Sequence, residues 1–480
     1  MRRRAALLCL SSLAAGLVAP PPAAAHGLVG RSDLPIPEWL FGWAAALVLM
    51  ISFVALAVLW PQPKLEDDGW RPLRGRLGRA LANRAAGLVA QVVCGAVGAF
   101  LLGVVVWSGL SGVQSPTANF APTFVYIVFW LGLVPVSVLF GDLFRAFNPW
   151  RAIGHAVAWV SRKVAGSPLP APLSYPAWLG RWPAAAGILA FAWLELVASN
   201  GDRPETLAIA TLVYSALTFI AMALYGVEEW TARGEAFSVY FNLFSRIAPF
   251  ERKEGRLGLR PPLSGLARLD AQPGTVPLLA VMIGSVTFDG AQESSLWTGI
   301  APDLARFFES LGLASERALE AAFGVGLVAA IALVYGFYRL GAVGARTVGG
   351  SFSAGRVAAA FVHSLVPIAL AYVAAHYLTL LLYQGQAAVF LASDPLGDGS
   401  DLFGTANRAI DYGVIGATAA WYYQVAFVVT GHVAALTLAH DRALALYDRA
   451  KLAVRSQYYM LAVMIGFTSL ALWLLSQANA

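Results

Sequence analysis

Charged side chains are scarce in this sequence of 480 residues. They make up 12% of the chain, and hydrophobic residues make up 58%. A soluble domain usually has about 25% charged and about 45 to 50% apolar residues. The composition therefore excludes an ordinary soluble globular domain and predicts an all-α, polytopic bundle of transmembrane helices.

Cysteine is almost absent, and so are the common catalytic motifs. Cys9 lies in an N-terminal segment that we expect to be removed, and Cys94 lies inside an apolar run. The chain thus lacks the cysteines for a disulfide framework or a cysteine metal site. It also has no Walker-type phosphate loop, no Gly-x-Ser-x-Gly elbow and no His-Glu-x-x-His pair on a span. Any metal must be held by His, Asp and Glu.

The first 25 residues have the pattern of a secretory signal peptide. A basic start is followed by the apolar run Ala5 to Val18 and by small residues up to Ala25. Cleavage after Ala25 would make His26 the first residue of the mature protein. A terminal histidine can chelate a metal through its amino group and its ring. Alternatively, His26 simply follows the cut.

The mature chain, residues 26–480, reads as a single polytopic membrane domain. A hydrocarbon core of about 30 Å needs about 20 helical residues. Apolar runs of suitable length predict ten spans: Trp39 to Trp60, Gly87 to Leu110, Pro122 to Phe140, Pro183 to Ala198, Thr206 to Gly226, Val276 to Trp297, Leu319 to Tyr338, Val357 to Tyr383, Gly413 to Leu438 and Tyr458 to Leu475.

Basic residues are distributed unevenly between the loops. If the mature N-terminus is outside, 25 of the 33 Lys and Arg residues lie in inner loops and five lie outside. The inner loops are 61–86, 141–182, 227–275, 339–356 and 439–457. This bias predicts a multi-pass protein of the cell's inner (cytoplasmic) membrane. The net charge of +6 is therefore a topology signal and does not indicate nucleic-acid binding.

Ionisable residues within the spans are the candidate functional groups, because a charge in hydrocarbon is costly and needs a partner or a cavity. Four of them are expected at similar depth on the outer side: Glu195, Asp289, Glu293 and His376. Asp289 and Glu293 share a face of a continuous helix, although Gly290 could break that helix. Tyr372 and Tyr383 lie on the same stripe as His376.

These residues predict a carboxylate-rich site for a divalent metal, with zinc or manganese the suspected ion. The candidate metal ligands are His376, Asp289, Glu293 and His26. Asp289, Glu293 and Glu195 are the candidate catalytic groups, with one carboxylate left free as a base.

A second pair of histidines, His363 and His432, is expected near the inner side. Both are predicted to lie about 9 Å deep, from about 1.5 Å of rise per residue. Two histidines level on neighbouring helices could ligate a b-type haem or one metal ion. They could equally hydrogen-bond each other, a backbone carbonyl or a tyrosine. The pair His440 and Asp441 is expected to cap its span in water.

Two inner segments are expected to lie at the membrane surface. In residues 148–163, tryptophans and aliphatic residues alternate with basic ones, which is typical of an interfacial helix. The loop from Val227 to Gly274 is too basic and too rich in proline for a large separate domain. We expect it to pack against the inner membrane surface.

Several stretches resemble a group of large integral membrane proteins from high-GC bacteria that are labelled fenitrothion hydrolase. The resemblance covers nearly the whole mature chain and is carried by five segments: HGLVGRSDLPIPEWLFGWAAALVL, FGDLFRAFNPWRAIG, VYFNLFSRIAPFERKEGRLGLRPPLSGLARL, VMIGSVTFDG and GHVAALTLAHDRAL. It implies hydrolysis of an organophosphorus ester. The group has no catalytic motif that can be transferred residue by residue.

Three functions follow from these observations. The first is a membrane hydrolase, with or without a metal, that acts on apolar, fenitrothion-like esters at the outer-side site. The second is a transporter or metal-handling protein in which the same residues form a path for a cation or small solute. The third, haem-based electron transfer, depends on His363 and His432 alone. The expected partners are the lipid bilayer and a small apolar substrate or a cation.

Reporter fusions test the topology. We expect cytoplasmic signals from fusions after Arg84, Arg181, Lys253 and Arg455, and external signals from fusions near Asp202, Asp303 and Asp398. A cytoplasmic signal at Asp398 would contradict the ten-span arrangement.

Overall fold

The computed structural model describes residues 38–75, 84–166, 173–348 and 352–478, which are almost entirely helical. The expected signal peptide and His26 lie outside these residues. Eight helical segments are long and apolar enough to cross a membrane: Leu40–Leu59, Gly87–Ser111, Phe120–Phe140, Pro204–Tyr225, Ser315–Thr347, Ala354–His376, Ala417–Leu446 and Ala450–Leu474. The prediction of an all-α polytopic membrane protein is confirmed at this level, and the count of ten spans stays a prediction.

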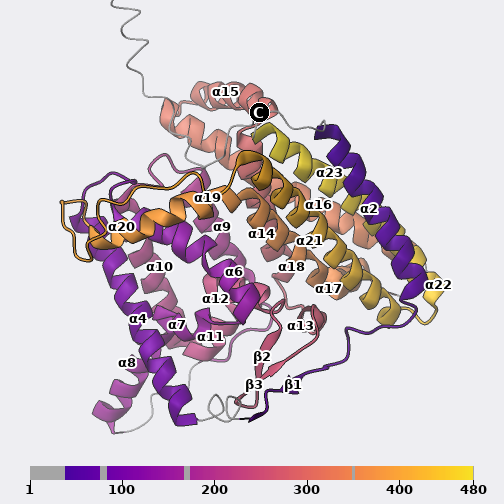
Figure 1. Ribbon diagram of the computed structural model, residues 1–480, viewed down its shortest axis with the longest axis horizontal. Helices are drawn as coiled ribbons and strands as arrows, with labels where there is room; N and C mark the ends of the chain where they lie inside the picture. The colour runs from indigo at the N-terminus through magenta and orange to yellow at the C-terminus, as the bar shows by residue number, and fades with distance from the viewer. Residues whose placement is uncertain (1–37, 76–83, 167–172, 349–351, 479–480) are drawn as a thin grey trace, which may run out of the picture.

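The helices form two groups that lie side by side (Figure 1). The first group contains α4 (Arg84–Ser111), α5 (Phe120–Pro122), η1 (Thr123–Leu131), α6 (Leu133–Phe140), α7 (Phe144–Phe147), α8 (Pro149–Ala165), α9 (Trp182–Leu196), α10 (Pro204–Tyr225), α11 (Val227–Arg233), α12 (Ala236–Ser245), α19 (Leu378–Tyr383), η3 (Gln384–Gln386) and α20 (Ala387–Ser393). The second contains α2 (Glu38–Leu59), α14 (Thr275–Gln292), α15 (Ser295–Ser310), α16 (Ser315–Thr347), α17 (Ala354–Phe361), η2 (Val362–Ser364), α18 (Leu365–His376), α21 (Ala417–Leu446), α22 (Ala450–Ser456) and α23 (Tyr458–Ala478).

Two of the expected spans are not long and apolar enough to be candidate membrane spans. They correspond to helices that lie where the two groups meet. Helix α9 has 15 residues and α14 has 18. In α14 every residue from Leu278 to Gly290 is buried, because α14 packs against α9, α16, α18 and α23. A helix surrounded by protein does not need a lipid-facing surface, so its composition can include Asp289 and Gln292 near its end.

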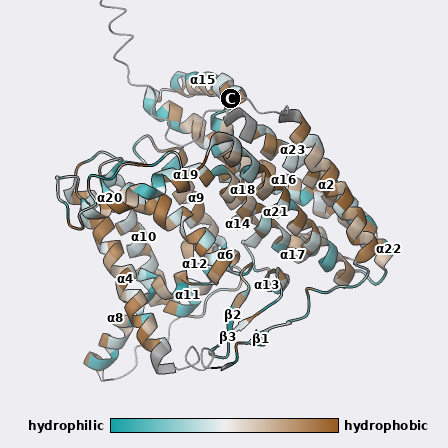
Figure 2. Cartoon of the chain, viewed as in Figure 1, coloured by the Kyte–Doolittle hydropathy of each residue, from teal (hydrophilic) through white to brown (hydrophobic). Residues whose placement is uncertain are grey.

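A small antiparallel sheet lies at the end of the bundle opposite α15 (Figure 1). Its strands are β1 (Arg71–Pro72), β2 (Phe250–Lys253) and β3 (Arg256–Leu259), in the order β1-β3-β2. The hairpin turn between β2 and β3 places Glu254 and Gly255 at positive φ, 50° and 77°. The short helix α13 (Ser264–Ala267) follows. Figure 2 shows brown apolar residues along the long helices and teal residues in the sheet and α11.

The long inner loop differs from its expected place at the membrane surface. Its helix α12 is inserted among α6, α9 and α18, and Phe241 and Phe244 are fully buried. The segment AFSVYFNLFS has no charged residue, so it can be buried as a unit. Glu235 caps its start by accepting hydrogen bonds from the backbone N–H groups of Phe237 and Ser238. The basic remainder of the loop forms α11, the strands β2 and β3, and α13.

The segment that was expected to form an interfacial helix is helical and corresponds to α8. It begins after Asn148, whose side chain accepts a hydrogen bond from the Arg151 backbone. Its exposed apolar residues include Trp159 and Val164. An ion cluster ties it to α11: Glu228 accepts a hydrogen bond from Arg151 Nε at 2.9 Å and contacts His155 Nε2 at 2.7 Å.

This cluster predicts an acid-sensitive contribution to stability. The hydrogen bond with His155, supported by Arg151 and Arg145, lowers the pKa of Glu228 to about 2. A carboxylate with a lowered pKa stabilises the fold fully above its ordinary value of 4.5 and loses that effect as the pH falls toward 2. Glu228→Gln should therefore flatten the fall in thermal midpoint of detergent-solubilised protein between pH 5 and pH 3. The effect should be about 1 kcal/mol or less, because Glu228, Arg145 and His155 are about half exposed.

Glu229→Gln on the same helix is the matched control, since the exposed Glu229 forms an ion pair with Arg233, which also lies in α11. Its midpoint should fall with pH as the parent's does. Equal slopes for the parent and Glu228→Gln would contradict the assignment.

Candidate functional site

Asp289 is a buried carboxylate at the centre of a hydrogen-bonded cluster. Its side chain is 1% exposed. Oδ2 lies 2.9 Å from Nε2 of His376 and accepts a hydrogen bond of 2.6 Å from the hydroxyl of Tyr377. Gln292 Nε2 donates to Oδ1 over 3.3 Å. Both carboxylate oxygens are therefore bonded, as burial of a carboxylate requires.

Three helices end around this cluster. Helix α14 ends at Gln292, α9 ends at Leu196 and α18 ends at His376. The carbonyl end of a helix carries about half a unit of negative charge. Three such ends and two carboxylates, Asp289 and Glu195, make this a region that favours a proton or another cation.

The break after His376 is a departure from the sequence expectation. The span was predicted to continue to Tyr383, but the chain leaves α18 at Tyr377 and turns into α19, which lies across the first group of helices (Figure 1). Tyr383 is consequently not on the His376 stripe, and its hydroxyl donates to the carbonyl of Ile415. Tyr372 does remain on α18, one turn before His376.

Glu195 belongs to the same region. Its carboxylate interacts electrostatically with Asp289, and its Oε2 is buried without a hydrogen-bond partner in the described part of the chain. The hydroxyl of Tyr240, on α12, is also buried and interacts with Trp130 and Glu195. An unpaired buried carboxylate oxygen is costly, so this side of the cluster can accept a proton or a polar ligand.

Trp130 closes the cluster toward the first group of helices. Its ring lies edge-on to that of Tyr377, with centroids 5.0 Å apart, and 5.2 Å from that of Phe191. Trp130 lies in η1, a π-helix of nine residues in which Gly132 N–H bonds to the carbonyl of Ile127. π-Helices are rare in proteins, and those that do occur often lie at functional sites. Apolar periodicity gives no signal for this element.

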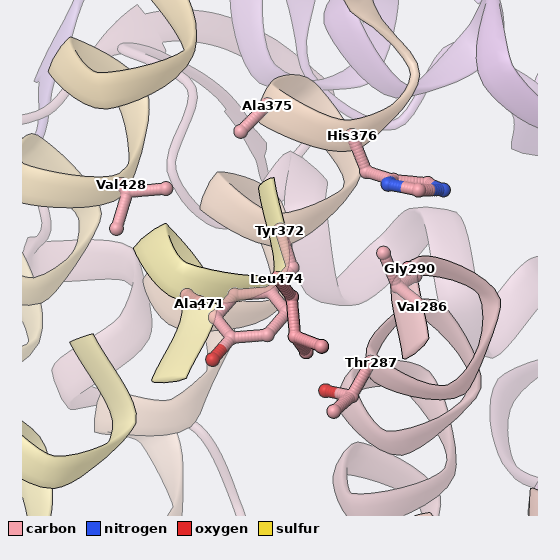
Figure 3. Close-up of a pocket in the computed structure, with 9 residues that line it drawn as sticks. All are labelled: Val286, Thr287, Gly290, Tyr372, Ala375, His376, Val428, Ala471 and Leu474. Atoms are coloured by element: carbon pink, nitrogen blue, oxygen red, sulfur yellow. The ribbon is translucent and has the colours of Figure 1, made fainter. Parts of the chain in front are cut away.

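A small cavity lies beside His376 (Figure 3). Its volume is about 20 Å³, which is enough for one water molecule. Its polar lining comes from His376, Thr287 and Tyr372, and Gly290 lies at its edge (Figure 3). A methyl group added at Gly290 would contact His376 at an ordinary distance of 3.7 Å. The absence of a side chain at this position therefore helps to leave the cavity open.

The structure brings together three of the four predicted outer-side residues. Asp289, His376 and Glu195 meet, whereas Glu293 is exposed. Glu293 caps α14 just after its last residue, so the helical face that would align it with Asp289 has ended. Gly290 does not break the helix, which is continuous from Thr275 to Gln292.

The inner histidines are not brought together. His363 lies against the backbone of Ala360 and Leu438, whereas the ring of His432 lies 6.3 Å from that of Tyr372. Leu438 is six residues beyond His432 on α21, about 9 Å along the axis. Each histidine is buried with an Nε2 that has no partner in the described residues. This offset does not match two axial ligands on one haem.

His440 and Asp441 are buried, contrary to the expected water-exposed cap. Each is 1% exposed. Asp441 accepts hydrogen bonds from Trp60 Nε1 at 2.9 Å, the Lys64 N–H at 2.6 Å and the Leu65 N–H at 3.0 Å. The pair thus fixes the segment after α2 to α21, which is a structural role. The sequence signal misled because both residues stand near the end of a long apolar run.

The residues do not fit the predicted metal site. No group of three or more His, Cys, Asp or Glu side chains within residues 38–75, 84–166, 173–348 and 352–478 is arranged to hold a metal. Asp289 is already bonded to His376 and Tyr377, and Glu293 lies apart. His26 is outside the described residues. No family model, curated protein or solved structure matches the chain.

The Asp441 network yields a stability prediction. Asp441→Asn should lower the free energy of unfolding by about 1 to 3 kcal/mol, because an amide cannot accept from all three donors and leaves buried N–H groups unpaired. Thermal unfolding in detergent measures the change. Asp448→Asn, at an exposed position, is the control and should change it little. An unchanged midpoint in Asp441→Asn would contradict this role.

Proposed function

We propose that this protein is a membrane transporter of the cation-coupled type, in which Asp289 and its partners bind and release a proton. The observation that carries the proposal is the burial of Asp289 where α18 breaks, with His376 and Tyr377 bonded to one carboxylate oxygen. Discontinuous helices and intramembrane carboxylates are the elements with which transporters bind coupling ions.

The chemistry of the partners favours a proton over a metal ion. The Tyr377 hydroxyl and Gln292 amide donate hydrogen bonds to Asp289, and Nε2 of the His376 imidazole contacts the same carboxylate. A metal ion bound to Asp289 would need ligand atoms with free lone pairs in the places that these hydrogen-bond donors occupy. Glu195, with its unpaired buried oxygen, is a second acceptor within the same negative region.

Neighbouring groups supply a route for the proton. On one side, the water-sized cavity touches His376 (Figure 3). On the other, Gln292 links Asp289 to the end of α14. A proton moving between these points passes through Asp289, and Trp130 and Tyr377 form an aromatic wall beside it.

Infrared spectroscopy of purified protein in lipid vesicles tests the protonation site. A pH titration should show the carbonyl band of a buried protonated carboxyl, and Asp289→Asn should abolish or shift that band. Proton flux driven by an imposed membrane potential, followed with a dye enclosed in the vesicles, should fall by at least about tenfold, which corresponds to about 1.4 kcal/mol in the barrier. Glu293→Gln, a change at an exposed carboxylate just beyond the end of the same helix, is the control.

An unchanged band and unchanged flux in both Asp289→Asn and Glu195→Gln would overturn the proposal. Gly290→Ala tests the role of the cavity independently of the cluster, because the added methyl group fills space beside His376 without removing a hydrogen bond. We expect this variant to keep the carboxyl band and to slow the flux.

Hydrolysis of an apolar organophosphorus ester, which the sequence resemblance implies, is the second candidate. It is supported by the Asp289–His376 pair, since a carboxylate that orients a histidine is a common general-base arrangement. His376 would take a proton from a water molecule as the water oxygen bonds to phosphorus and the phenolate leaves. The adjacent cavity of about 20 Å³ holds the water but has no room for the ester, which places this candidate second.

An assay for nitrophenolate release separates the two functions. Release by the parent and its loss in His376→Ala, with Glu293→Gln unaffected, would favour the hydrolase. Proton flux without release would favour the transporter.

A further inference from the structure

A large apolar cavity occupies the first group of helices, separate from the Asp289 cluster. Its volume is about 710 Å³, and it lies between α4, η1, α9, α10 and α12. None of its lining residues has a charged side chain. The aromatic rings of Phe129, Trp150, Phe191 and Phe237 form much of its wall.

Helix α9 contributes a strip of small residues to this cavity. Ala186, Gly187 and Ala190 all line it and stand at helical spacing on one face. Small residues on a span usually allow a neighbouring helix to approach closely. Here α12 approaches closely at Gly187, where an added Cβ would lie 2.6 Å from the Cβ of Ala236, whereas Ala186 and Ala190 are exposed and line the cavity.

The cavity reaches the lipid-facing surface at Leu217. On α10 the cavity-lining residues include Ala210, Tyr214 and Leu217, and the strongly exposed stripe comprises Val213, Leu217, Ile220 and Leu224. Leu217 belongs to both sets and is 62% exposed. At 3.6 residues per turn the two stripes are adjacent and meet at this residue, so the opening faces the hydrocarbon of the bilayer.

We propose that this cavity binds an acyl chain of a membrane phospholipid, which enters beside Leu217. Water is a poor occupant, because a wall without charges offers too few hydrogen-bond partners for this volume. An empty cavity would forgo dispersion contacts along the whole wall. The volume is within the range of ligand pockets, about 300 to 1,000 Å³. Acyl chains are the apolar groups that surround spans α4 and α10.

This binding site is independent of the proposed proton site. The residues that line the cavity do not include Asp289, His376, Tyr377 or Glu195. Loss of lipid binding and loss of protonation are therefore measured separately, and either proposal can fail alone.

Photochemical labelling of the full chain tests the proposal. The protein is reconstituted into phosphatidylcholine vesicles that contain a phosphatidylcholine with a diazirine in its acyl chain. After illumination, we expect adducts on the cavity-facing segments 98–105 and 186–194. The variant Ala190→Phe places a ring in the cavity and should reduce these adducts by at least about tenfold, because a filled cavity has no space for the chain.

Val213→Phe, on the lipid-facing stripe outside the cavity, is the matched control and should leave the adducts unchanged. Adducts restricted to lipid-facing positions such as Val213, Ile220 and Leu224 in the parent would overturn the proposal, whether or not the variants fold. Extraction of the purified protein gives a second measurement. Recovery of a neutral apolar compound other than phospholipid, at one molecule per chain, would overturn the assignment to an acyl chain.

Discussion

The fold is organised around one carboxylate held inside an apolar bundle. An ionised Asp289 in this position requires hydrogen-bond donors and shielding from lipid, because an isolated charge in hydrocarbon is costly. His376 and Tyr377 supply the bonds, and neighbouring helices surround α14 on all sides. The break between α18 and α19 follows from the same need, since it brings two consecutive residues, His376 and Tyr377, onto one oxygen.

The sequence was sufficient to identify the class of protein and part of this cluster. Composition indicated a polytopic membrane protein, and charged residues within apolar runs pointed to Asp289, His376 and Glu195. Similar depth in the membrane was enough to group these three. Depth alone could not show that Glu293 lies outside the cluster. That depends on where α14 ends, and helix ends are poorly defined by apolar periodicity.

The aromatic members of the cluster could not be found in this way. Tyr377, Tyr240 and Trp130 are ordinary residues of apolar segments. Only the folded chain shows that the two tyrosines interact with carboxylates and that Trp130 packs against Tyr377. The burial of α12 could also not be predicted from the sequence, because basic segments flank its short uncharged stretch. For His363 and His432, in contrast, the sequence grouped two residues that the structure keeps apart. Equal distance from the ends of two spans suggested a level pair, but the helices pack with an offset along α21.

The π-helix η1 imposes a constraint on chain length. Trp130 stands at its end, between Tyr377 and the ring of Phe191 that lines the apolar cavity. Each bond in a π-helix spans one residue more than in an α-helix. Deletion of one residue between Thr123 and Phe129 would let the segment wind as an ordinary α-helix and would turn Trp130 out of this wall. The segment should consequently accept exchanges among apolar residues far more readily than the gain or loss of a single position.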